Sequence, residues 1–382
     1  MRNSQNTDVL IIGGGVIGLA IARELHKKGI KRITLLEKGR AGQESSWAAA
    51  GMLGPQAEAD EGGAFFDICC ASRDLYLDFA AELFDETGVD IELDRAGTLY
   101  LAFTDEDVSV VHKRLKWQSK AGLAVEHLSA EKARKAEPFI SPNVREALFF
   151  PNDWQVENRK LLIALKSYAG LNGIMICENS KAERLIVNGG AVIGAETDAG
   201  IFLADKTVLA TGAWTSLIKL GLAESPLKIE PVRGQIVAFQ TARRLFQCVI
   251  YSRRGYIVPR MDGRIMAGST SENVGFDKSV TEWASARLRE IAVEIAPDIS
   301  SLPVADQWAG LRPFAADGLP ILGEIAGLDG LFIATAHYRN GILLAPLTAK
   351  IAADRLTDGT DSKYLNAFGP GRFTLRVAGT GN

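Results

Sequence analysis

The sequence predicts an α/β protein with two domains, in which an opening β-α-β unit is joined to a second, largely antiparallel sheet. Three observations lead to this fold class. The chain has 382 residues, which is more than one ordinary core requires. It opens with a short apolar strand, a glycine-rich turn and a helical segment. Between residues 90 and 310, short branched or aromatic segments separated by polar turns are more typical of strands.

The composition is that of a globular protein. Hydrophobic residues make up 47% and charged residues 23%, which excludes wholesale disorder and fibrous repeats. Lys and Arg number 43 against 46 Asp and Glu, so a generally basic nucleic-acid binder is excluded. Four cysteines without a C-x-x-C pair and four histidines far apart in sequence predict neither a disulfide scaffold nor a metal site.

The N-terminal apolar run at 9–22 resembles the core of a signal peptide. Three consecutive glycines interrupt it at 13–15, where a helical segment would be weakened most. It is also shorter than the ~20 residues that cross a bilayer. We therefore expect a cytoplasmic protein without stable membrane insertion.

The first motif is a strand at 8–12 followed by G-x-G-x-x-G at 13–18 and a helix at 19–28. In such a unit Gly13 permits the tight turn, Gly15 lets a pyrophosphate approach the backbone, and Gly18 allows the helix to pack closely. The helix N-terminus offers free N–H groups to phosphates. The sequence therefore predicts a Rossmann-like dinucleotide site.

A second strand at 33–36 ends in Glu37, placed to accept hydrogen bonds from the ribose hydroxyls of an adenosine. A carboxylate there also repels a 2′-phosphate, which argues against NADP. The motif by itself leaves open whether FAD or NAD is bound.

Further elements follow from periodicity and turn residues. Residues 54–63 are expected to form a solvated loop rather than a mobile flap, and Pro346 is expected to open the last long helix. The predicted helices are 65–87, 108–121, 287–295 and 346–356, and the predicted strands are 98–103, 174–177, 184–187, 191–195, 206–210, 235–239, 256–259, 264–268 and 331–334.

Seven blocks, in this order, make the chain resemble the D-amino-acid oxidase family of FAD-dependent amine oxidoreductases, and within it the glycine oxidase branch. Together they span nearly the whole chain. They are IIGGGVIG at 11–18, AAAGMLG at 48–54, VLATGAW at 208–214, PVRGQ at 231–235, YIVPR at 256–260, WAGLRP at 308–313 and HYRNGILL at 337–344.

The resemblance implies a discontinuous FAD-binding domain and a substrate-binding domain whose sheet covers the flavin. The FAD-binding domain is expected at 1–88, 155–226 and 306–368, and the substrate-binding domain at 89–154 and 227–305, with a loose tail at 369–382. FAD is expected to be bound non-covalently, because the related sarcosine oxidases attach it to a cysteine in the C-terminal half and no cysteine follows Cys248 here.

Carried over position by position, the resemblance implies flavin-binding residues along the whole chain. Ala182 departs from the valine common in the family, which a main-chain contact to adenine tolerates. The cofactor-binding residues are Gly13, Gly15, Val16, Ile17, Gly18, Glu37, Lys38, Ser45, Ser46, Ala50, Gly51, Met52, Ala182, Thr211, Gly212, His337, Tyr338, Arg339, Asn340, Gly341, Ile342 and Leu343.

The resemblance also implies three catalytic residues. Arg312 is expected to hold the substrate carboxylate with its guanidinium fork, and Tyr256 to donate its hydroxyl to the same group. Arg339 is a second cation near the site. Spacing alone leaves structural roles open for all three residues. His337 is taken as a flavin contact rather than a base.

The implied activity is oxidation of glycine, sarcosine or small D-amino acids to imine and then oxo acid, with O2 as acceptor and hydrogen peroxide as product. A dehydrogenase passing electrons to a quinone or protein is the main alternative; an NAD-dependent dehydrogenase and a non-enzymatic flavin-binding protein are weaker ones. The family further implies a homo-oligomer, and a role in thiazole synthesis for thiamine or in catabolism.

Overall fold

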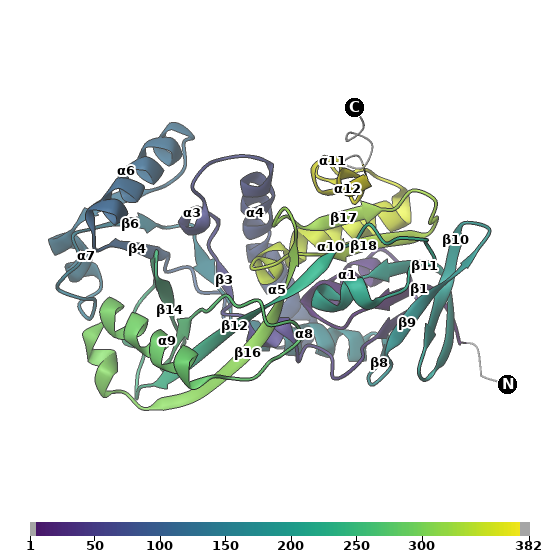
Figure 1. The fold of residues 1–382 in the computed structure, drawn as a ribbon, viewed down its shortest axis with the longest axis horizontal. Coiled ribbons are helices and arrows are strands. Elements are labelled where there is room, and N and C mark those ends of the chain that lie inside the picture. Colours follow the sequence, from purple (N-terminus) through teal and green to yellow (C-terminus); the bar gives the residue numbers. More distant parts are fainter. Residues whose placement is uncertain (1–4, 375–382) are drawn as a thin grey trace.

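The computed structural model describes residues 5–374 and arranges them around two large β-sheets (Figure 1). Within these residues, eight strands form a first sheet in the order β17-β18-β11-β1-β2-β8, with β10 paired to β11 and β9 to β10. The strands are β1 (Gln5–Ile12), β2 (Ile33–Leu36), β8 (Met175–Cys177), β9 (Ala182–Asn188), β10 (Ala191–Thr197), β11 (Gly200–Leu209), β17 (Ile321–Glu324) and β18 (Leu331–Thr335).

The opening β-α-β unit is confirmed. Strand β1 pairs in parallel with both β2 and β11, and its residues are almost fully buried from Val9 to Ile12, as expected of a strand covered on both faces. Helix α1 (Val16–Lys27) follows the glycine turn and packs against α8 (Asn158–Leu171) and α10 (Gly341–Asp358).

The second sheet is largely antiparallel, as predicted. Among the described residues it contains eight strands in the order β16-β12-β15-β14-β13-β4-β6-β5, and only β13 and β4 run parallel. The strands are β4 (Thr98–Ala102), β5 (Glu126–Ser129), β6 (Glu146–Phe150), β12 (Ile229–Gln240), β13 (Val249–Ser252), β14 (Gly255–Pro259), β15 (Arg264–Gly268) and β16 (Val304–Ala315); β3 (Met52–Leu53) and β7 (Trp154–Gln155) pair separately.

The remaining helices lie around these sheets (Figure 1). They are α2 (Ser45–Ala48), α3 (Pro55–Glu58), α4 (Ala64–Asp74), α5 (Tyr76–Thr87), α6 (Asp105–Lys120), α7 (Ala130–Ala136), α9 (Glu282–Ile295), α11 (Leu365–Phe368) and α12 (Gly371–Thr374), with 3-10 turns η1 (Gly212–Leu217) and η2 (Pro297–Ser301).

Strand β16 lies across the expected boundary between the two domains. It pairs along its length with β12 in the second sheet, although the expected boundary assigns residues from 306 onward to the flavin-binding domain. The division itself stays a prediction. Of the expected loose tail, residues 375–382 lie outside the described part, whereas α12 is held by Arg372, whose Nε donates to Asp317 at 2.7 Å.

The segment at 54–63 was expected to be a solvated loop, and this is wrong for its first half. Gln56 and Ala57 in α3 are each 1% exposed, and their backbone N–H groups donate to the buried carboxylate of Asp153 at 3.2 and 2.7 Å. Residues 60–63 are exposed. The carboxylate, distant in sequence, therefore converts part of a polar turn into a buried helix.

The expected helix at 65–87 is divided at Leu75 into α4 and α5, and Pro346 does not open a helix. Helix α10 begins at Gly341 and contains Pro346 internally. A proline there removes the N–H that would bond to the carbonyl of Ile342. The Tyr76 hydroxyl donates to that carbonyl instead, and Ser72 Oγ donates to the next one, Leu343, at 2.7 Å.

Tyr76→Phe is therefore expected to lower the free energy of unfolding by about 1–3 kcal/mol, because it leaves the buried Ile342 carbonyl without a donor. Urea unfolding followed by circular dichroism measures the change. Tyr364→Phe, at another tyrosine of the same core cluster, is the matched control. Equal losses in both variants would contradict the role assigned to the Tyr76 hydroxyl.

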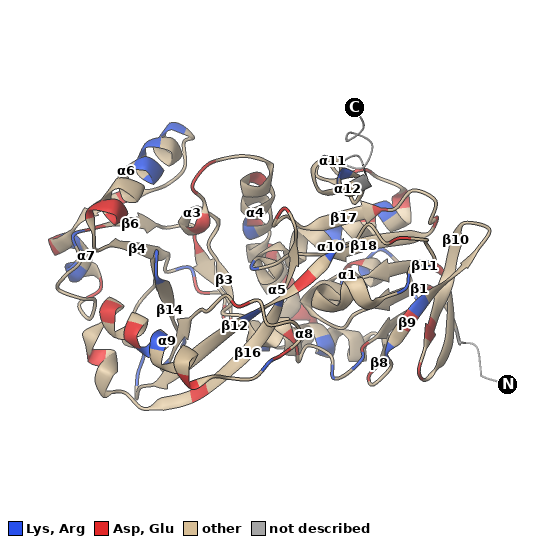
Figure 2. Ribbon diagram, viewed as in Figure 1, with Lys and Arg blue, Asp and Glu red and all other residues tan. Residues whose placement is uncertain are grey.

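Acidic and basic residues are scattered over both sheets and their helices (Figure 2). Among the helices of residues 5–374, none combines the length and the apolar character that crossing a membrane requires.

Candidate functional site

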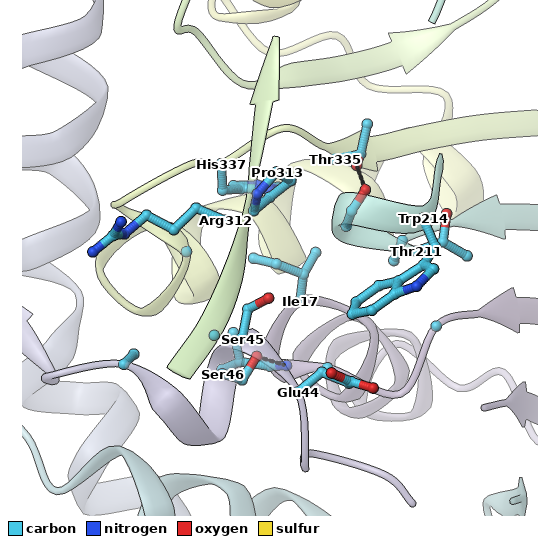
Figure 3. Close-up of a pocket in the computed structure, with 18 of the residues that line it drawn as sticks. Ile17, Glu44, Ser45, Ser46, Thr211, Trp214, Arg312, Pro313, Thr335 and His337 are labelled. Atoms are coloured by element: carbon cyan, nitrogen blue, oxygen red, sulfur yellow. Dashed lines mark hydrogen bonds between the residues drawn. The ribbon is translucent and has the colours of Figure 1, made fainter. Parts of the chain in front are cut away.

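A cavity of about 520 Å³ opens between the two sheets. Its walls come from the turn after β1, from α2, from the second-sheet strands β12, β14 and β16, and from the start of α10. Figure 3 shows Trp214 and Thr211 at one end of this cavity and the Arg312 side chain at the other, with Ser45, Ser46 and Ile17 between them.

The glycine turn is shaped by close backbone contacts. Gly13 has a φ of +114°, and a Cβ placed on it would lie 2.3 Å from the carbonyl oxygen of Ala210. A Cβ on Gly18 would lie 2.0 Å from the carbonyl oxygen of Gly13. Gly18 does not line the cavity, so its role here is to let α1 approach the turn.

The N-terminus of α1 faces the cavity at Gly15 and Val16. The Val16 N–H donates to Ser46 Oγ at 3.0 Å, which links the turn to α2. Helix N-termini carry unpaired N–H groups and a partial positive charge, so this wall suits an anion such as a pyrophosphate.

Glu37 lies at the end of β2 and is 8% exposed. Its carboxylate accepts the N–H groups of Gly14 and Gly39, both at 2.9 Å, and so fixes the glycine turn. A carboxylate has about four acceptor positions, so hydroxyl groups of a ribose can still bind.

At the same end, the predicted residue Lys38 lies beside two lining residues that extend the expected set, Trp214 and Glu44. Lys38 Nζ lies 3.9 Å from the ring centroid of Trp214 and 2.7 Å from Glu44 Oε1. Trp214 and Glu44 both line the cavity, but sequence reasoning assigned neither. Trp214 belongs to the block at 208–214, which was the available signal; nothing in the sequence distinguishes Glu44.

A second helix N-terminus reaches the cavity from α10, at Asn340, Gly341 and Ile342. The chain reaches it from β18 through Ala336 and Tyr338, which have positive φ values of 58° and 47°. Such backbone is uncommon outside glycine and is frequent at functional sites.

His337 lines this part of the cavity and is buried. Its Nε2 lies 3.0 Å from Thr348 Oγ1. Burial lowers the pKa of His337 to about 3, so the imidazole is neutral at physiological pH. This arrangement suits a packing or contact role.

Arg312 projects from β16 and lines the cavity. Its Nη1 donates to the Thr270 carbonyl at 3.0 Å and its Nη2 to Ser269 Oγ at 2.7 Å, and burial lowers its pKa. Both partners are neutral. A guanidinium has five donors, so the remaining ones are free for an anion.

Three fully buried arginines differ from the half-buried Arg312 in this respect. Arg23, Arg233 and Arg260 each form an ion pair with a carboxylate, whereas the described chain provides none for Arg312. A desolvated cation without a counter-charge is costly. The part of the cavity beside Arg312 therefore suits an anion.

Tyr256 is 5% exposed and lines the same cavity, and its ring stacks on Tyr251 at 5.9 Å. Arg339 lies nearby but is already paired: its Nη2 donates to Tyr251 Oη at 2.8 Å and to Glu58 Oε1 at 3.2 Å. The charge of Glu58 raises the pKa of Arg339. Glu58 and Ser269 are further lining residues that sequence reasoning missed.

The structure brings nearly all predicted site residues to one cavity. Gly18 and Leu343 are the exceptions; Leu343 is 1% exposed and packs in the core. The predicted residues that line the cavity are Gly13, Gly15, Val16, Ile17, Glu37, Lys38, Ser45, Ser46, Ala50, Gly51, Met52, Ala182, Thr211, Gly212, Tyr256, Arg312, His337, Tyr338, Arg339, Asn340, Gly341 and Ile342.

These residues fit FAD. The N-terminus of α1 and the glycine turn suit the pyrophosphate, and Glu37 suits the ribose. The start of α10 offers N–H groups that can stabilise negative charge on a reduced flavin ring.

Comparisons with known proteins agree with this reading. The profile of the "FAD dependent oxidoreductase" family matches residues 8–355. The glycine oxidase of Pseudomonas aeruginosa is 34% identical over 355 residues, covering 91% of this chain and 94% of that protein. The bifunctional protein ThiO/ThiG of a Synechocystis species is 36% identical over 96% of this chain and 54% of its own length.

A similar structure is the crystal structure of glycine oxidase from Geobacillus kaustophilus. It superposes with a TM-score of 0.90 at 34% identity, covering 96% of this chain and 98% of that chain. The family match over most of the chain, together with the geometry of the cavity, shows that the protein is an enzyme whose cofactor is FAD. The chain belongs to the FAD-dependent oxidoreductase family that contains the glycine oxidases.

Proposed function

We propose that the protein is an FAD-dependent oxidase of glycine and other small amino acids, including sarcosine and small D-amino acids. The observation that carries this proposal is the half-buried guanidinium of Arg312, which has only neutral partners and faces the cavity together with Tyr256. The named glycine oxidases among its relatives support the same substrate class.

In this proposal the chain acts by orientation. Arg312 binds the substrate carboxylate through its free donors, and Tyr256 donates its hydroxyl to the same group. Ser269 Oγ and the Thr270 carbonyl hold the guanidinium in place. FAD, when bound, supplies a two-electron acceptor for hydride from the carbon that bears the amine.

Glu58 and Arg339 shape the open side of the pocket. Their charges offset each other, so we expect a single substrate carboxylate to bind more favourably at Arg312 than at Arg339. The oxidised product is an imine, which water converts to an oxo acid and ammonia, or a primary amine in the case of sarcosine. We propose O2 as the final electron acceptor, with hydrogen peroxide as the product.

Anaerobic mixing with glycine, sarcosine or D-alanine should bleach the flavin absorbance, and admission of air should restore it with formation of peroxide. Stopped-flow spectroscopy and a peroxidase-coupled assay measure the two half-reactions. Bleaching without peroxide would replace O2 by another acceptor and make the enzyme a dehydrogenase. A flavin that none of the three amines bleaches would overturn the proposed substrate class.

We further propose that FAD is held without a covalent bond. All four cysteines lie within the described residues, and none of them lines the cavity. Precipitation with trichloroacetic acid should therefore leave all yellow colour in the supernatant and a colourless pellet. A yellow pellet would contradict non-covalent binding. A homo-oligomeric state and a cytoplasmic location stay predictions.

A further inference from the structure

Three side chains from three elements converge on the second sheet, away from the flavin cavity. They are His112 on α6, His127 on β5 and Glu146 on β6. Figure 1 shows α6 and β6 in the part of the molecule opposite α1 and β1. The three residues lie outside the lining of the cavity, so the proposed oxidation does not use them.

Their geometry is compact. Nε2 of His112 and Nε2 of His127 each lie 2.8 Å from the same oxygen, Oε2 of Glu146. One potential ligand atom from each residue lies within 4.8 Å of the other two. The two imidazole rings meet edge to face, with centroids 5.8 Å apart.

The sheet and the helix both contribute to this placement. In the β5–β6 pair, Ser129 is opposite Glu146 and His127 is opposite Leu148, so His127 and Glu146 are diagonal neighbours on one face. Helix α6 then brings His112 within hydrogen-bond distance of the same carboxylate.

We propose that His112, His127 and Glu146 form a binding site for a divalent transition metal ion, with Zn²⁺ as the representative ion. Two imidazole nitrogens and one carboxylate oxygen are a ligand set that suits zinc, nickel or copper, whereas calcium and magnesium prefer oxygen ligands alone. The site is partly exposed, so water can complete the coordination.

The two Nε2 atoms and the Glu146 oxygen would need to move only a short distance to bind a metal ion. Metal–ligand bonds of about 2.0–2.2 Å in a tetrahedral site place neighbouring ligand atoms roughly 3.3 Å apart. The present nitrogen–oxygen distances of 2.8 Å would therefore open by about half an ångström.

The metal would link α6 to the β5–β6 pair. The same helix supports the flavin side of the molecule at another point, because Gln118 Nε2 donates to the Gln56 carbonyl at 3.0 Å and Gln56 Nε2 donates to Gln118 Oε1 at 2.9 Å. The metal would therefore stabilise the position of α6, which contacts α3 through Gln118 and Gln56. This role is structural and differs from that of a second reaction centre.

Isothermal titration of zinc chloride into the untagged, EDTA-dialysed holoenzyme tests the proposal. We expect one zinc ion per chain, and at least ~10-fold weaker binding in His127→Gln and in Glu146→Gln. His26→Gln is the matched control, because His26 is bonded to Tyr168 on α8 and should not affect zinc binding. Calcium chloride should give no comparable binding.

Thermal unfolding of the same proteins is the second measurement. Saturating zinc should raise the melting temperature of the wild type and of His26→Gln, and should leave that of His127→Gln unchanged. Retained flavin absorbance in every variant shows that the fold is intact. Equal zinc affinity in the wild type and in His127→Gln would overturn the proposal, as would an equal loss in His26→Gln.

Discussion

Arg312→Ala is expected to lower kcat/KM for glycine by roughly 30- to 5,000-fold while the enzyme stays yellow. This range corresponds to about 2–5 kcal/mol, the usual cost of removing one partner of a buried charge pair. Arg312 has only neutral partners in the structure, so the substrate carboxylate is its proposed counter-charge. Steady-state kinetics with a peroxide readout, together with flavin absorbance, measures both parts of this prediction.

Two further variants make the test of Arg312 sharper. Arg312→Lys keeps the charge but loses the two-pronged hydrogen bonding, so it should recover only part of the activity. A Cβ on Gly234 would lie 2.2–2.3 Å from the guanidinium atoms of Arg312, so Gly234→Ala should displace that side chain and raise KM. Gly170→Ala, where a Cβ meets no atom within 4 Å, is the matched control.

The opposite pattern would identify Arg312 as structural. In that case Arg312→Ala would lose FAD, and the fraction that keeps it would turn over normally. An unchanged KM in Gly234→Ala would independently contradict the substrate-binding role of Arg312.

Gly13→Ala is expected to abolish the yellow holoenzyme. The added methyl group would lie 2.3 Å from a backbone oxygen of Ala210, at a φ of +114° that L side chains rarely adopt. Neither β1 nor β11 can move easily, because they are paired in parallel through seven residues on each strand. We expect a loss of about 4 kcal/mol or more in stability, measured by urea unfolding, and a colourless or insoluble product.

Gly29→Ala distinguishes the effect of backbone strain from the effect of the close contact with Ala210. Gly29 also has a positive φ, +96°, but a Cβ there meets no atom within 4 Å. Backbone strain alone should cost about 1–3 kcal/mol and leave FAD bound. If Gly13→Ala behaves like Gly29→Ala, the close contact with Ala210 is not decisive.

The sequence could predict the dinucleotide end of the site because its determinants are local. Strand, glycine turn, helix, strand and Glu37 follow one another within about 30 residues, and each has a separate physical requirement. The carboxylate of Glu37 and the turn of Gly13 lie where the motif predicts. Arg312 and Tyr256 followed only from the resemblance, because nothing in their own segments distinguishes them from structural residues.

Residues that depend on long-range contacts could not be predicted in this way. Glu58 is placed in the pocket by Asp153, which is 95 positions away along the chain. Ser269 accepts a hydrogen bond from Arg312, although nothing in its own segment predicts that contact. Pro346 is tolerated inside α10 because Tyr76 supplies the hydrogen bond that its own backbone cannot make.

The sequence by itself determined the β-α-β unit, since a short motif with fixed spacing encodes it, and the family resemblance, which in turn implied FAD. The tertiary structure alone decided that Arg312 has only neutral partners, and it brought together His112, His127 and Glu146, whose spacing in sequence had predicted no metal site. The physical reason is that charge compensation and ligand geometry depend on distances in space, which sheet pairing and helix packing set only after the chain has folded.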